Sequence, residues 1–107
     1  MAWTWLFLAA ALEIVMGISL KLTAGWTRPG ASVIAVVSGL GSIYLLALAL
    51  RSLPVGMAYA MWTGVGTMGL VLTGMLVFQD EMSWARAFFM GLIFIGVIGL
   101  RVTDTAG

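Results

Sequence analysis

The feature that most constrains this chain is a series of four long apolar runs, each close to the length that crosses a lipid bilayer. The runs cover residues 2–21, 31–51, 55–78 and 84–102. A membrane-spanning helix needs about 20 apolar residues, so four of them take up about 80 of the 107 residues. The runs are continuous rather than alternating, which disfavours the strands of a membrane barrel. The sequence therefore predicts an all-α integral membrane protein, with four transmembrane helices in a single transmembrane domain over residues 1–107.

The composition excludes most functions of soluble proteins. The chain is 63% hydrophobic and 8% charged, whereas soluble domains are about 45–50% apolar and about 25% charged. A net charge of +1 gives no basic surface for nucleic acid. Without Cys or His there is no disulfide, no zinc site and no thiol or imidazole catalysis. We therefore expect no enzyme, no nucleic-acid partner, no metal and no cofactor.

The basic residues are divided almost evenly between the two sides of the predicted bundle. If the helices alternate in direction, Arg51 and Arg101 lie on one side, and Lys21, Arg28 and Arg86 lie on the other. So small a difference gives little orientation by the positive-inside rule. One interpretation is a weakly oriented protein whose direction is set during insertion. The other is insertion in both directions and pairing with an inverted copy, which resembles the inverted repeats of transporters and predicts an antiparallel, dual-topology dimer.

One acidic residue, Glu13, lies inside an apolar run. A charge at membrane depth is costly, and it usually faces a bundle interior or a wet cavity and has a function. A purely structural ion pair with Lys21 or Arg101 is the alternative, but Lys21 is two turns away and out of direct reach on one helix. Met16 and Gly17 are expected to share the face of Glu13. A carboxylate there can hold either a proton or a cation, which is the chemistry of a proton/cation antiporter.

One face of the third run carries aromatic, hydroxyl and small residues: Tyr59, Trp62, Thr63 and Gly66. Aromatic rings near a carboxylate suit a planar or weakly hydrated organic cation. An interfacial aromatic belt explains Trp62 poorly, because this residue lies in the middle of the run. Gly64 and Gly66 are expected either to let the helix bend, as a gate requires, or to let helices pack closely.

The second and fourth runs add further candidate positions. Ser42 lies in the middle of the second run, where it could cap its own backbone or orient Glu13. The fourth run has no polar side chain from 87 to 100, so we do not expect it to line an aqueous site. Its glycines are expected to contact a second subunit, with plain lipid contact as the alternative; they are Gly91, Gly96 and Gly99.

The segment Leu53–Gly66, together with Gly25-Trp26-Thr27-Arg28 and Glu13, resembles the small multidrug resistance family, and the resemblance extends over essentially the whole chain. It implies an antiparallel dimer of four-helix subunits that exports cations in exchange for protons, with Glu13 of both subunits at the site. It also implies a multi-pass protein of the bacterial inner membrane. The positions that match residues lining the site in the family are Ser42, Tyr59 and Trp62.

Within the family, the chain most resembles the guanidinium-exporter subtype. The similar segments are Met1-Ala2-Trp3, Trp62-Thr63-Gly64 and Gly99-Leu100-Arg101. That subtype commonly has Trp at the position of Met16 and Lys at the position of Arg101. Because Met16 is smaller than Trp, the resemblance implies guanidinium or a larger guanidinyl compound, such as guanylurea or a substituted guanidinium. The alternatives are a broad exporter of quaternary ammonium and aromatic cations, one subunit of a heterodimer with a paralogue, or a proton channel.

Overall fold

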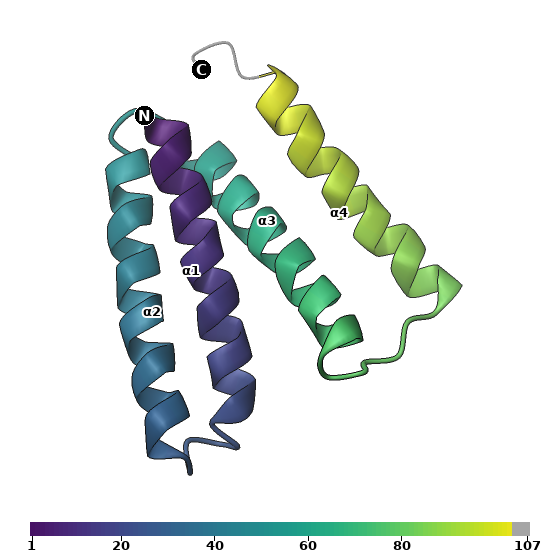
Figure 1. Cartoon of the computed structure of the whole chain (residues 1–107). Coiled ribbons are helices and arrows are strands. Elements are labelled where there is room, and N and C mark those ends of the chain that lie inside the picture. The colour runs from purple at the N-terminus through teal and green to yellow at the C-terminus, as the bar shows by residue number, and fades with distance from the viewer. Residues whose placement is uncertain (104–107) are drawn as a thin grey trace.

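The computed structural model describes residues 1–103, which form four helices that run alternately in opposite directions (Figure 1). They are α1 (Ala2–Leu22), α2 (Pro29–Ala49), α3 (Val55–Leu76) and α4 (Trp84–Thr103). All four are long and apolar enough to cross a membrane. The start of α1, the α2–α3 connection and the end of α4 lie at the same end of the bundle (Figure 1). The prediction of a multi-pass, all-α membrane protein is confirmed.

Helix α1 is the central element, because it packs against both α2 and α3. Helix α4 packs mainly along α3, touches α1 through Arg101 and Trp3, and lies at the edge of the bundle (Figure 1). The α1–α2 interface is built from small residues, and lipid tails are as apolar as any helix face, so close van der Waals approach holds such helices together. The small buried residues on these two helices are Ala9, Ala10, Ser19, Ala35, Ser38, Gly39, Ser42 and Ala49.

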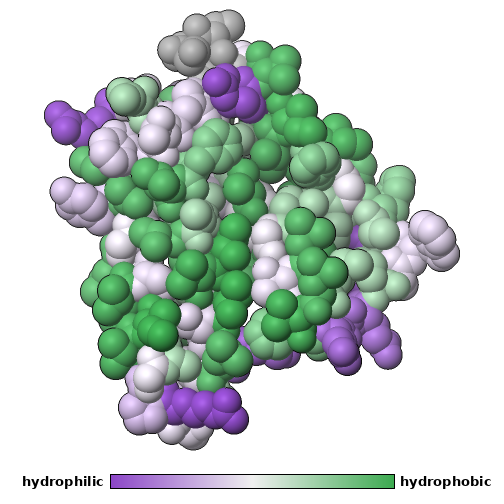
Figure 2. Space-filling model, viewed as in Figure 1, coloured by the Kyte–Doolittle hydropathy of each residue, from purple (hydrophilic) through white to green (hydrophobic). Residues whose placement is uncertain are grey.

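Apolar side chains cover the middle of the molecule, and hydrophilic ones gather toward its ends (Figure 2). Helix α4 is the extreme case, because none of its residues is buried within the described chain. Helix α2 also turns an apolar face outward, on which Val33, Val37 and Leu40 are each more than 60% exposed. These surfaces suit contact with lipid or with another membrane helix.

The helix ends lie within two residues of the expected positions. The largest differences are that α2 begins and ends two residues early and α3 ends two residues early. Helix α2 begins at Pro29 because proline has a fixed φ that suits the first helical position and needs no N–H partner there. The preceding turn is closed by Thr23, whose Oγ1 donates to the Leu20 carbonyl at 2.7 Å and accepts from the Trp26 amide at 3.2 Å.

Two contacts between cations and aromatic rings lie at the ends of α1. Lys21 Nζ lies 5.5 Å from the centre of the Phe78 ring, and Arg101 Cζ lies 4.5 Å from the centre of the Trp3 ring. Long basic side chains lay their apolar stems along such surfaces and keep their charges toward water. Both cations that were considered as structural partners of Glu13 are thus placed against aromatic rings at the helix ends.

Candidate functional site

The side chains around Glu13 are divided between two neighbouring helices. Leu12 and Met16 face α2, since a methyl group on Gly41 would lie 3.1 Å from Leu12 Cδ1 and one on Gly39 would lie 2.8 Å from Met16 Sδ. Glu13 itself faces α3. Helical spacing predicts that Met16 and Glu13 share one face of α1. In the structure, Met16 contacts α2, whereas Glu13 contacts α3.

The contact of Glu13 with α3 is made possible by Gly66. A methyl group on Gly66 would collide with Glu13 Oε1 and would lie 2.7 Å from its Cδ. Only glycine leaves room for the carboxylate at this point, so Gly66 has a packing role in addition to any part in helix bending. Further contacts of the same kind along this interface join Gly69 to Ile14 and Gly17 to Leu70.

The Glu13 carboxylate is incompletely satisfied. Its Oε1 is buried and has no hydrogen-bond partner within residues 1–103. Buried polar atoms are nearly always hydrogen-bonded, and leaving one unpaired costs about 1–3 kcal/mol, or more for a charged group. An exception of this kind inside a membrane bundle makes Glu13 a candidate position for binding a proton or a ligand.

Ser42 connects three helices close to this carboxylate. Its hydroxyl donates to the Ala9 carbonyl at 2.6 Å and accepts from Trp62 Nε1 at 2.9 Å. Ala9 lies one turn before Glu13 on α1, and Ser42 is only 1% exposed. The hydroxyl proton is therefore used neither to cap α2 nor to orient Glu13, the two roles that the sequence left open. Through these two hydrogen bonds, the Ser42 hydroxyl links the indole of Trp62 to α1.

The aromatic face of α3 lies next to Gly66. Tyr59 and Trp62 form an edge-to-face pair with ring centres 5.5 Å apart. Tyr59 is 49% exposed, Thr63 is also exposed, Trp62 is half-buried and Gly66 is buried. Because one helical turn separates Trp62 from Gly66, this face leads from the surface of the subunit to the carboxylate.

The remaining candidate glycines have different surroundings. A methyl group on Gly64 would collide with Val97, so Gly64 is a close-packing point between α3 and α4. The helix continues through this position without interruption. A methyl group on any of the three α4 glycines would meet no heavy atom within 4 Å, so the α3–α4 contact does not use them; they are Gly91, Gly96 and Gly99.

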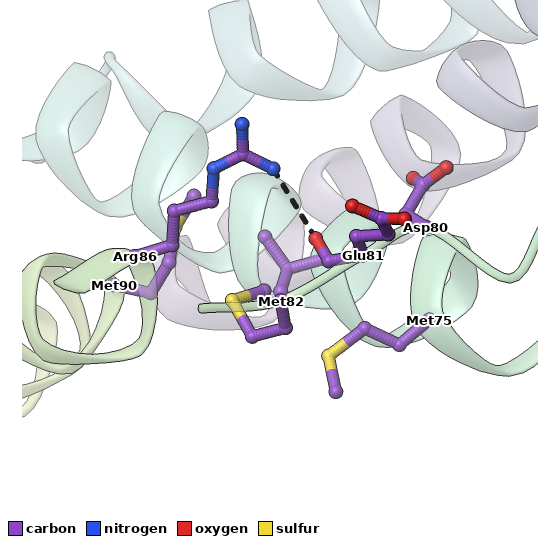
Figure 3. Close-up of a pocket in the computed structure, with 7 residues that line it drawn as sticks. Met75, Asp80, Glu81, Met82, Arg86 and Met90 are labelled. Carbon is purple, nitrogen blue, oxygen red and sulfur yellow. Dashed lines mark hydrogen bonds between the residues drawn. The ribbon is translucent and has the colours of Figure 1, made fainter. Parts of the chain in front are cut away.

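A hollow of about 360 Å³ lies where α3 connects to α4, and the sequence analysis did not single it out (Figure 3). Arg86 Nη1 donates to the Glu81 carbonyl across it at 3.2 Å. Asp80 and Glu81 belong to the short connection, a setting typical of a solvated loop, and Arg86 lies in the first turn of α4; Glu13 is not among the lining residues. The hollow is thus separate from Glu13, and its lining consists of Val71, Met75, Asp80, Glu81, Met82, Arg86 and Met90.

A membrane-spanning helical bundle that holds one unpaired carboxylate oxygen, with aromatic rings a turn away, has the features of a small transporter for cations. Comparison with known proteins agrees, because a model of the family described as "Small Multidrug Resistance protein" matches residues 1–93. The chain belongs to the small multidrug resistance family. This is a family of transporters, so the chain is not an enzyme.

Similar proteins match the chain over nearly its whole length. It is 45% identical over 103 residues to a protein of Citrobacter freundii named "Guanidinium exporter", covering 96% of this chain and 98% of that protein. It is 42% identical over 104 residues to a "Guanidinium exporter" of Yersinia pestis, covering 97% of this chain and all of that protein. A protein of the same name from Salmonella typhimurium is 42% identical over 103 residues, with 96% and 98% covered.

Proposed function

We propose that this chain exports guanidinium-type cations, namely guanidinium, guanylurea or a substituted guanidinium, in exchange for protons. The observation that carries the proposal is the buried Oε1 of Glu13, which lies against Gly66 without a hydrogen-bond partner. A guanidinium group is planar and presents paired N–H donors that match a carboxylate in two parallel hydrogen bonds. A proton bound to the carboxyl removes its charge, so proton and cation bind in turn, and this alternation couples the two movements.

The aromatic residues of α3 support a planar cation as the substrate. A guanidinium plane stacks on an aromatic face, and the attraction is stronger where water is excluded. Trp62 is held in place by Ser42, and Tyr59 packs edge-on against Trp62. We infer that these three residues, with Met16, Gly17 and Thr63, line the substrate site around Glu13.

We infer further that the transporter is an antiparallel dimer of oppositely inserted copies in the inner membrane of a bacterium. Helix α4 buries no residue within the described chain, and its glycines lie open for a second subunit. The helix directions place Arg51 and Arg101 at one end of the bundle, and Lys21, Arg28 and Arg86 at the other (Figure 1). This near balance favours insertion in both orientations. The bacterial relatives support the location.

The proposal is tested by transport with the purified chain alone in liposomes that contain a pH-sensitive dye. An imposed gradient of guanidinium or guanylurea should drive a pH change, and tetraethylammonium should give a much smaller one. Glu13→Gln should abolish the response, because an amide nearly matches the carboxyl in shape but neither releases a proton nor carries a charge. Glu81→Gln is the matched control, since Glu81 is an exposed acid outside the helices, and its response should equal that of the original chain.

Three results would contradict parts of this proposal. Proton movement that persists in the Glu13→Gln variant would exclude the carboxylate as the coupling group. A larger response to tetraethylammonium than to guanidinyl compounds would favour the broad exporter of quaternary ammonium and aromatic cations. No transport by the purified chain, with activity restored by a paralogous subunit, would favour the heterodimer.

A further inference from the structure

We propose that Gly39 of α2 is a positioning residue for substrate selection, because it gives the thioether of Met16 a place to lie away from Glu13. The inference rests on the proposed function, since it concerns the width of the cation site at Glu13. Gly39 acts through Met16 and not through contact with the substrate.

The contact between these residues is close and specific. A methyl group on Gly39 would lie 2.8 Å from Met16 Sδ and 3.6 Å from Met16 Cγ. The sulfur atom thus lies near the volume that any larger residue at position 39 would need. Gly39 is buried and Met16 is half-buried, so this contact belongs to the interior of the α1–α2 interface.

The direction in which Met16 would move follows from its surroundings. Long side chains on a helix lean toward its N-terminus, which places the thioether beside the turn that carries Leu12 and Glu13. Leu12 already packs on Gly41 of α2, and Ser38, next to Gly39, is buried. Leu12, Ser38 and Gly41 also line an apolar hollow of about 460 Å³ between α1 and α2, so two directions are open to a displaced thioether, and the inference requires the one toward Glu13. An unchanged ratio of the two substrates in Gly39→Ala would show that the thioether enters the hollow instead.

The displacement affects substrate choice more than folding. The atom in conflict is near the end of an unbranched side chain with three rotatable bonds, so a change of rotamer relieves the overlap without moving the backbone. The sulfur then occupies space beside the carboxylate. Guanidinium needs little of that space, but a substituted guanidinium needs more, and a group of methylene size changes discrimination by about tenfold or more.

The experiment measures transport of guanidinium and of phenylguanidinium by the full-length chain in liposomes. In Gly39→Ala, the ratio of kcat/KM for phenylguanidinium to that for guanidinium should fall by about tenfold. Met16→Ala removes the thioether, so adding Gly39→Ala to Met16→Ala should leave the ratio of the Met16→Ala variant unchanged. Gly41→Ala is the matched control, since a methyl group there meets Leu12 and not Met16, and its ratio should equal that of the original chain.

Each other outcome counts against the inference. If Gly39 only spaces the two helices, Gly39→Ala lowers transport of both cations equally, and the loss persists without the thioether of Met16. If Gly39→Ala does not fold, the double variant with Met16→Ala distinguishes the two roles of Gly39. The double variant has no thioether for the new methyl group to overlap, so its failure to fold would also assign Gly39 to helix spacing. Failure of the original chain to transport either cation would instead overturn the proposed function.

Discussion

The tightest contact at the site gives a quantitative prediction for Gly66→Ala. The new methyl group would lie 2.7 Å from Glu13 Cδ and would collide with Oε1. Nonbonded carbon atoms lie about 3.5–4.0 Å apart at their optimum, so the carboxyl group must retreat by about 1 Å. Helix α1 can accommodate this by rotation of the Glu13 side chain, and we expect the variant to fold.

The cost should appear in function, because the displaced group is the one proposed to bind the cation. A misplacement of about 1 Å lowers the rate of a well-organised site by up to about 100-fold. This corresponds to about 2.7 kcal/mol, at 1.36 kcal/mol for each factor of ten. We therefore expect kcat/KM for guanidinium to fall by one to two orders of magnitude, with a much smaller change in the thermal unfolding temperature in detergent.

A compensating change makes the prediction sharper. Glu13→Asp shortens the side chain by one carbon–carbon bond, about 1.5 Å, and so removes the overlap with a methyl group at position 66. Alone, Glu13→Asp should also weaken transport, because it draws the carboxylate back from α3. The double variant should be more active than the product of the two single losses predicts, with a coupling energy of about 1 kcal/mol or more.

Gly69→Ala is the matched control on the same face of α3. A methyl group there would collide with Ile14, next to Glu13, but not with the carboxylate. We expect this variant to change stability and to leave competition between protons and guanidinium unaltered. Transport by Gly66→Ala with the original affinity, or strictly independent effects in the double variant, would refute the placement of Glu13 Oε1 against Gly66.

Three further predictions follow from the same structure. Ser42→Ala removes hydrogen bonds that are worth about 1–2 kcal/mol together, so it should lower the unfolding temperature in detergent and alter the fluorescence of Trp62. Acidification on the substrate side should raise the apparent Kd for guanidinium, since protons compete for Glu13; an affinity that is flat with pH would contradict this. Two Lys added within residues 23–27 should fix the orientation and lower activity, and co-expression with a copy carrying two Lys within residues 50–54 should restore it.

The sequence determines the fold of this chain well, because a bilayer imposes a nearly fixed length on each helix. The four helices end within two residues of the expected positions, and the local chemistry of Pro29 and Thr23 accounts for the clearest shift. Glu13 is also recognisable from the sequence, since it is the one acidic residue within an apolar run. The length of an apolar run and a charge inside it can both be read within a single helix, so they predict the helix bounds and Glu13 from the sequence alone.

The partners of the site residues were not predictable in the same way. Helical spacing places Met16 close to Glu13 on α1, but it does not say that α2 contacts one and α3 the other. The acceptor of the Ser42 hydroxyl is Ala9, 33 positions away in the sequence, and no local pattern marks it. Gly39 resembles the other glycines of α2 until the position of Met16 is known. These relations depend on how helices are arranged against one another.

The position of α4 has a consequence for how proteins of this kind can diverge. This helix touches the others mainly through α3, buries none of its own residues and lines no part of the space beside Glu13 that the structure describes. If α4 forms the proposed contact with a second subunit, substitutions on its outer surface would change which subunit is recruited and would leave the proposed site at Glu13 unchanged. After a gene duplication, two copies could become obligate partners through mutations in α4 and still export the same compound. Under the proposed dimer contact, choice of partner and choice of cargo are separately heritable traits in a chain of 107 residues.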